Sequence, residues 1–188
     1  MNAAHANQIV LGVVEALDAA SIAYMLVGSF SSNLYGRPRS TQDADFVVQM
    51  DAADVAALRQ RLGPDFQIDP QMSFETVTAT TRYIIRHRST AFKVELFLLG
   101  PDPYDDARFS RRQKVDFAGR SVWVPSAEDV VITKLRWSQA GQRSKDVVDV
   151  AGVLAAQSAR LDVTYMREWC DRHGTRKLLD ELLGKTCG

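Results

Sequence analysis

The sequence has no excess of charge of either sign. Lys plus Arg and Asp plus Glu are equal, at 23 each among 188 residues, so the formal net charge at pH 7 is zero. A protein that acts mainly on DNA or RNA usually carries a basic excess. The totals therefore do not argue for extended nucleic acid as the partner, and they slightly favour a small or local substrate.

Cysteine and histidine are also scarce. The chain has two cysteines, Cys170 and Cys187, and three histidines, His5, His87 and His173. The cysteines form no CxxC pair and the histidines have no ligand spacing, so the sequence predicts neither a disulfide framework nor a zinc site. A metal-dependent hydrolase with histidine ligands is disfavoured for the same reason.

Long apolar runs are missing as well. The apolar stretches are far shorter than the roughly 20 residues that a membrane span needs. Residues 1–8 do not show the basic and then apolar pattern of a signal peptide. We therefore expect a soluble, cytoplasmic protein with no membrane partner.

The hydrophobic pattern predicts strands and helices that alternate, and then helices alone. The expected helices in the first part span 4–20, 30–35 and 51–62. The expected strands span 22–27, 45–50, 83–86, 91–99 and 121–124. After Pro125 the pattern is helical, with a capping-box signature at Ser126 and Asp129 and breaks near Gly141, Asp162 and Gly174. This order predicts an α+β fold, with a small mixed β-sheet flanked by helices in residues 1–125 and a helical C-terminal part in residues 126–188.

Asp43 and Asp45 are the first candidates for chemistry. Residues two apart on a strand point to the same side, and two neighbouring carboxylates repel each other unless a cation lies between them. Mg²⁺ prefers carboxylate oxygens and keeps other coordination positions for phosphate and water. An Asp-x-Asp pair at the start of a strand therefore suits Mg²⁺, whereas the pair taken alone is more typical of solvated loop acids.

Two further features add to this pair. Gly28 and Ser29 follow an apolar strand and open a short helix, where backbone amides and a hydroxyl can hold phosphate oxygens. Glu95 lies in the middle of an apolar strand, where a carboxylate is costly unless it is paired or bound to metal. The alternative for Glu95 is the wet face of an edge strand, with Lys93 beside it.

Together these features resemble the nucleotidyltransferase superfamily of the DNA polymerase β type. The superfamily motif is an apolar residue before Gly-Ser, a spacer, an Asp-x-Asp and a third acid on a later strand. Here the motif is carried by Val27-Gly28-Ser29, Asp43-Ala44-Asp45 and Val94-Glu95-Leu96. Glu95 stands where Asp is commoner.

The resemblance narrows to the bacterial AbiEii-type toxins and related nucleotidyltransferases. These carry Gly-x-x-Arg-x-Ser/Thr-x-Asp-x-Asp, which fits Gly36, Arg39, Thr41 and the Asp43/Asp45 pair. They also carry a helical motif in which a Lys is followed twelve residues later by an Asp, as with Lys134 and Asp146. Lys145 replaces the Arg that usually precedes this Asp.

The resemblance implies an enzyme that moves a nucleotidyl group from an NTP to an acceptor hydroxyl. Asp43, Asp45 and Glu95 would be both metal ligands and catalytic groups, for two Mg²⁺ (or Mn²⁺) ions or for one ion plus the ion that the nucleotide carries. Substrate would be bound by Gly28, Ser29, Arg37 or Arg39, Thr41, Lys134 and Asp146. The acceptor is open between tRNA, a small molecule and a protein hydroxyl, and a cognate antitoxin protein is a possible partner. Two rivals remain: a non-catalytic partner or antitoxin-like protein of the same fold, and an antibiotic nucleotidyltransferase of the aminoglycoside type.

Overall fold

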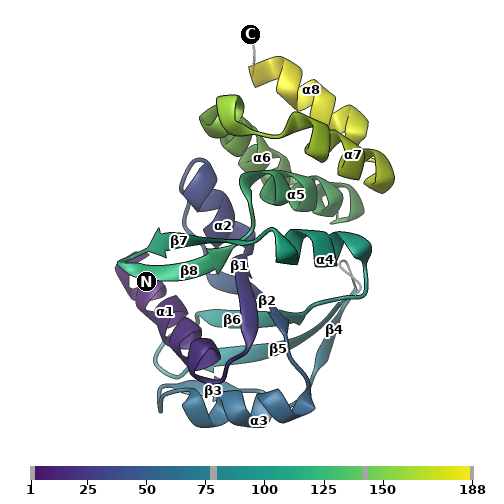
Figure 1. Cartoon of the computed structure of the whole chain (residues 1–188). Helices are drawn as coiled ribbons and strands as arrows, with labels where there is room; N and C mark the ends of the chain where they lie inside the picture. Colours follow the sequence, from purple (N-terminus) through teal and green to yellow (C-terminus); the bar gives the residue numbers. More distant parts are fainter. Residues whose placement is uncertain (1–2, 77–79, 142–143, 187–188) are drawn as a thin grey trace.

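Strands of both directions build the main sheet of the computed structural model, which describes residues 3–76, 80–141 and 144–186 (Figure 1). The strand order is β1-β2-β6-β5-β3, with β4 paired to β5 off this path. Only β2 and β6 run parallel, and the other pairs are antiparallel. The strands are β1 (Ala23–Val27), β2 (Asp43–Gln49), β3 (Phe66–Ile68), β4 (Ser73–Glu75), β5 (Thr80–His87) and β6 (Lys93–Leu98). The predicted mixed sheet is thus confirmed.

Side-chain alternation along β2 separates the main core face from the face that carries the acids. Phe46 and Val48 are fully buried and belong to the main hydrophobic cluster, together with Val13 and Leu17 of α1 (Ala3–Ala19). Asp43 and Asp45 alternate with these residues and therefore project from the opposite face. Helix α3 (Ala52–Arg61) lies near α1 and adds Leu58 to the same cluster. The apolar face therefore fixes the strand register, and with it the direction of the acids.

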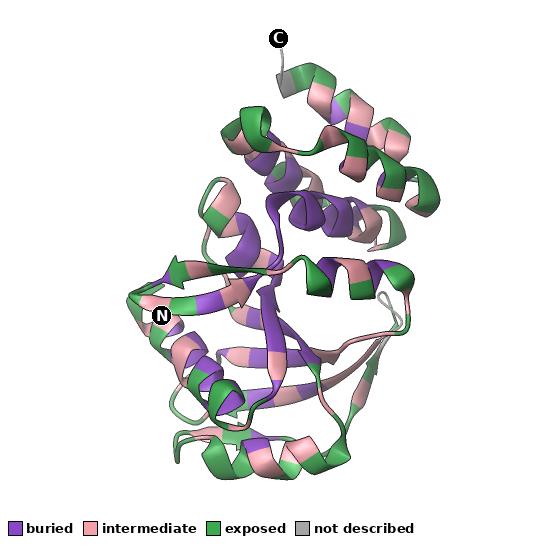
Figure 2. Ribbon diagram, in the orientation of Figure 1, coloured by how far each residue is buried: buried purple, intermediate pink, exposed green. Residues whose placement is uncertain are grey.

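The helices after Pro125 form a layer at one end of the sheet (Figure 1). They are α5 (Ala127–Gly141), α6 (Ser144–Gln157), the short 3-10 turn η1 (Ser158–Arg160), α7 (Val163–His173) and α8 (Arg176–Thr186). Their buried apolar residues make a second cluster, which Tyr104 from α4 (Pro103–Ser110) joins. Figure 2 shows burial concentrated along α5, which packs on α6 and α7. The division into residues 1–125 and 126–188 stays a prediction, and the presence of two clusters agrees with it.

Close contacts join the helical layer to α2 (Gly28–Tyr35). The Tyr35 hydroxyl donates to the Pro125 carbonyl at 2.9 Å, and the Gln157 amide donates to the Tyr35 carbonyl at 3.1 Å. At Gly36 a Cβ atom would lie 3.0 Å from the Val153 backbone nitrogen. The end of α2 therefore lies directly against the backbone of α6.

The helix boundaries after Pro125 follow the predicted signals. Helix α5 ends at Gly141, Asp162 caps α7 by accepting from the Tyr165 amide, and Gly174 ends α7 in the left-handed region. The Ser126 hydroxyl accepts from the Asp129 amide at 3.2 Å and donates to the Asp129 carboxylate at 2.9 Å. Half of the expected capping box is present, because Asp129 bonds the Ser126 hydroxyl rather than its backbone.

Several elements between residues 66 and 117 were not predicted. Besides the short strands β3 and β4 they are α4 (Pro103–Ser110) and β7 (Gln113–Phe117), which forms a hairpin with β8 (Arg120–Val124). Asp102 caps α4 through the Tyr104 amide, and Pro103 occupies the first turn. Because proline suits the first position of a helix, Asp102 and Pro103 together form a helix start.

Cys170 is buried and has a free thiol, whereas Cys187 lies outside the described residues. Within the described ranges, none of the helices combines the length and the apolar character that crossing a membrane requires.

Candidate active site

A glycine turn between β1 and α2 contacts the strand that carries the acid pair. Gly28 has φ of 65°, in the left-handed region, and a Cβ atom there would overlap the Asp45 carboxylate. Val27, at the N-cap position of α2, provides no side-chain cap for the first amides of the helix. The turn therefore requires glycine for two separate reasons, and it brings the start of α2 against Asp45.

The three predicted acids lie on one face of the sheet. Asp45 pairs in register with Val27 on one side and with Glu95 on the other, and Asp43 pairs with Lys93. The Thr41 hydroxyl donates to the Asp43 carboxylate at 2.9 Å. The parallel pairing of β2 and β6 thus places Glu95 beside Asp45, as the motif requires. Thr41 contacts Asp43 through its hydroxyl.

Glu95 is nevertheless engaged by two basic side chains. Its carboxylate accepts from the Lys93 ammonium at 2.7 Å and from the Arg82 guanidinium at 3.1 Å, and only 7% of the Glu95 side chain is exposed. In the described part of the chain, no group of three His, Cys, Asp or Glu side chains is arranged to hold a metal ion. Both oxygens of the Glu95 carboxylate are bound by cations of the protein itself.

Arg39 links the glycine turn to the helical layer. Its guanidinium donates to the Ser29 hydroxyl at 2.8 Å and makes two bonds to Asp149, at 2.9 and 3.0 Å. The hydrogen bond to Asp149 raises the pKa of Arg39. The arginine is therefore a fixed positive charge beside Ser29.

Lys134 and Asp146, twelve residues apart in the sequence, are in contact. The buried Lys134 ammonium lies 3.0 Å from Asp146 and 2.7 Å from Asp149. Burial alone would raise the pKa of Asp149, but hydrogen bonds from Arg39 and Lys134 lower it overall. Asp149, three residues after Asp146 on α6, joins both cations, and sequence reasoning did not single it out.

Asn33 was missed by sequence reasoning. Its side-chain amide donates to the Arg39 carbonyl at 2.8 Å, and its carbonyl accepts from the Arg39 amide at 3.0 Å. This pair of bonds fixes the loop that carries Arg39. A single Asn inside a short helix carries no sequence signal of such a role. Arg37, the other candidate in the loop, is exposed.

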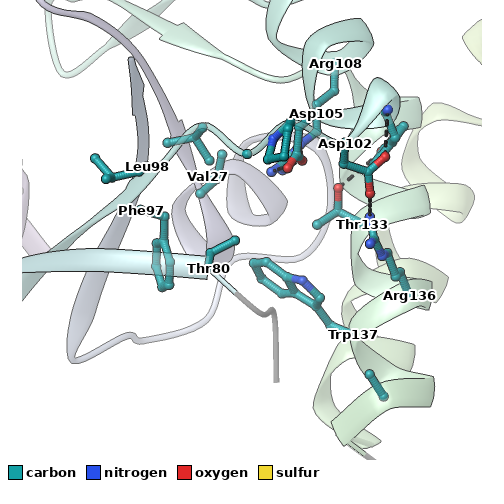
Figure 3. A pocket seen from close by; sticks show the side chains of 15 residues that line it. Val27, Thr80, Phe97, Leu98, Asp102, Asp105, Arg108, Thr133, Arg136 and Trp137 are labelled. Carbon is teal, nitrogen blue, oxygen red and sulfur yellow. Dashed lines mark hydrogen bonds and ion pairs between the residues drawn. The ribbon is translucent and has the colours of Figure 1, made fainter. Parts of the chain in front are cut away.

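A cavity of about 540 Å³ opens on the same face of the sheet as the acids (Figure 3). The strand residues that line it are Val27, Val47 and Phe97. Val27 pairs with Asp45 on the neighbouring strand, Val47 lies two residues after Asp45 on β2, and Phe97 lies two residues after Glu95 on β6. Trp137 reaches into it from α5 toward Thr80 (Figure 3). The cavity is thus closed by the sheet on one side and by α4 and α5 on the other, and it lies beside Asp45 and Glu95, which do not themselves line it.

A family model described as nucleotidyl transferase AbiEii toxin, type IV TA system, matches residues 16–185. No curated protein matches the chain.

Solved structures of nucleotidyltransferases share the fold. The solution structure of the antibiotic-resistance factor ANT(2'')-Ia superposes with a TM-score of 0.61 at 11% identity, over 95% of this chain and 96% of that one. Its crystal structure with adenylyl-2''-tobramycin gives 0.62 at 11% identity, over 92% and 99% of the two chains. An antigenic nucleotidyltransferase-like protein from Paracoccidioides brasiliensis gives 0.59 at 17% identity, over 95% and 92%.

Proposed function

The chain belongs to the AbiEii nucleotidyl transferase toxin family, and from this premise we propose that it is a Mg²⁺-dependent (or Mn²⁺-dependent) nucleotidyltransferase. It moves an NMP group from an NTP to an acceptor hydroxyl and releases pyrophosphate. We further propose that it is the toxin of a type IV toxin–antitoxin pair and has a cognate antitoxin protein as its partner.

The observation that carries this proposal is the position of the basic network beside the acid pair. Asp149 binds both Arg39 and Lys134, Arg39 also donates to the Ser29 hydroxyl, and Ser29 follows the glycine that packs against Asp45. Hydroxyl, guanidinium and ammonium groups are the usual ligands of a triphosphate. A site for a metal–NTP complex requires groups that donate hydrogen bonds to phosphate, next to paired carboxylates that hold the metal ion.

The donor set around Asp43 and Asp45 fits Mg²⁺. The two carboxylates share one face of β2, and the missing Cβ of Gly28 lets the phosphate-binding turn approach Asp45. When bound, Mg²⁺ supplies charge neutralisation of the phosphate oxygens and of the leaving pyrophosphate. Asp43 and Asp45 would hold the ion, and Thr41 would orient Asp43. Glu95 would lie on the side of the acceptor.

Each remaining residue has a positional role. The first amides of α2 and the Ser29 hydroxyl would hold the β- and γ-phosphates. Arg39 and Lys134 would stabilise negative charge on the leaving pyrophosphate. Asp146 and Asp149 would keep Lys134 in place, and Asn33 would keep Arg39 in place.

Calorimetric titration with each NTP in the presence of Mg²⁺ tests the donor side. We expect one NTP to bind the wild type and to lose measurable affinity in Asp43→Asn/Asp45→Asn, which keeps the size of both side chains. Asp106→Asn, an exposed acid on α4, is the matched control and should bind normally. A well-folded wild type that binds no NTP would overturn the enzyme and favour the non-catalytic partner.

Transfer of label from an α-³²P-NTP identifies the acceptor. One arm offers bulk tRNA, a second offers tobramycin and a third offers the protein alone. Label on tobramycin would favour the antibiotic nucleotidyltransferase, whose chemistry is the same. Label on tRNA or on protein would favour the toxin.

A further inference from the structure

Both oxygens of the Glu95 carboxylate are bound by cations of the protein itself. Oε1 lies 2.7 Å from the Lys93 ammonium and Oε2 lies 3.1 Å from the Arg82 guanidinium. Asp43 differs, because its carboxylate accepts a hydrogen bond from a neutral hydroxyl, that of Thr41. A hydroxyl can rotate away from a metal ligand at little cost, whereas a cation repels an incoming metal ion.

The two cations are fixed by the sheet. Lys93 lies two residues before Glu95 on β6, so both side chains project from the same face, and Arg82 comes from the neighbouring strand β5. The Arg82 guanidinium also lies over the Phe97 ring, 5.6 Å from its centre. The pairing of β5 with β6 therefore brings both positive charges to the same carboxylate.

Register places the lysine within the acid group. The Lys93 backbone lies opposite Asp43, and Glu95 lies opposite Asp45, in the parallel pair of β2 and β6. The ammonium is therefore next to the acids, on the side of Glu95. A two-ion arrangement would need a second divalent ion in this region.

We propose that Lys93 takes the place of the second, acceptor-side cation, so that the site binds a single divalent ion. Asp43 and Asp45 hold this ion, and Glu95 is a partner of Lys93 and Arg82 rather than a metal ligand. The inference rests on the proposed function, since it concerns the metal–NTP site of that activity. In this arrangement one divalent ion and the Lys93 ammonium take the place of two divalent ions. Two acid ligands, Asp43 and Asp45, take the place of three.

Counting bound Mn²⁺ ions tests this directly. Mn²⁺ is titrated into equimolar protein and the α,β-methylene analogue of ATP, CTP, GTP or UTP, which cannot release pyrophosphate, and free Mn²⁺ is measured by electron paramagnetic resonance. We expect one ion per complex in the wild type. Lys93→Met should bind two, because the Oε1 oxygen of Glu95 that Lys93 occupied can then act as a ligand while Arg82 still holds Oε2, and Lys93→Met/Glu95→Gln should return to one.

Lys114→Met is the matched control. Lys114 is an exposed lysine on β7, where it lies over the Trp123 ring, and its loss should leave one ion. Two ions in the wild type would overturn the inference, and this count does not depend on how any variant folds. One ion in a folded Lys93→Met, checked by circular dichroism, would overturn it too. A wild type that binds neither nucleotide analogue nor Mn²⁺ would instead overturn the proposed function itself.

Discussion

Replacing Gly28 with alanine is the sharpest test of how the phosphate turn is built. Two effects act at this position. The backbone lies at φ of 65°, and the added Cβ would overlap the Asp45 carboxylate while lying 3.0 Å from its Cγ. The first effect strains the backbone. The second displaces Asp45, which we propose as a ligand of the metal ion.

Gly119 separates the two effects. It has φ of 84° in the hairpin between β7 and β8, and a Cβ atom there would have nothing within 4 Å. Gly119→Ala therefore suffers the left-handed strain alone, about 1–2 kcal/mol. Gly28→Ala suffers the same strain plus the overlap, for which about 1–3 kcal/mol is typical. The difference between the variants isolates the packing of the turn on Asp45.

Urea unfolding and calorimetric NTP titration measure the two consequences. We expect Gly28→Ala to lose at least about 1 kcal/mol more unfolding free energy than Gly119→Ala. Its NTP affinity should fall about 100-fold, equivalent to about 2.8 kcal/mol, whereas Gly119→Ala binds normally. If Gly28→Ala binds NTP as tightly as Gly119→Ala, the approach of the turn to Asp45 does not build the site, and the reasoning is refuted.

Three further variants test the network beside the turn. Asn33→Ala removes both hydrogen bonds to the Arg39 backbone, so unfolding free energy in urea should fall by about 2 kcal/mol and NTP binding should weaken in calorimetry. Arg39→Lys keeps the charge but loses the two-pronged contact with Asp149, so NTP binding should weaken about tenfold, or about 1.4 kcal/mol; Arg37→Lys should have no effect, and equal losses would contradict the choice of Arg39. Asp149 has a lowered pKa because Arg39 and Lys134 outweigh its burial. Its contribution to stability is therefore complete above the unfolded pKa of about 3.9 and is lost as pH falls through the lower folded pKa. Urea unfolding from pH 6 to pH 3 should show a shallower acid loss in Asp149→Asn than in the wild type, and parallel curves would contradict the assignment.

Strands β1, β2, β5, β6 and β8 and the acid positions could be predicted because each follows from a local pattern. Alternation along residues 43–49 determines which side chains enter the core, and the apolar members are strong enough to fix the register. Once the register is fixed, Asp43 and Asp45 must share a face. Helix ends at Gly141 and Gly174 and the cap at Asp162 were predictable for the same reason, since each depends on neighbours within one turn.

The partners of the acids could not be predicted, because they depend on contacts distant in sequence. Arg39 and Asp149 are 110 positions apart, and Arg82 lies 13 positions before Glu95 on another strand. Sequence reasoning described Lys93 only as a neighbour of Glu95 on a wet face. Instead Glu95 is buried and the lysine binds it, so the arrangement depends on which strand pairs with which.

The same long-range contacts imply that the helical layer is part of the site. Lys134 comes from α5 and Asp149 from α6. Asp149 binds Arg39, which in turn binds Ser29, and both of these residues belong to the part of the chain that contains the sheet. A buried lysine between two carboxylates is stable only if all of its partners are present, because a lone buried charge is strongly destabilising. Loss of α6 would therefore leave both Lys134 and Arg39 without Asp149. The phosphate-binding side of the site thus depends on the packing of the helices against α2, where Gly36 lets the two backbones meet.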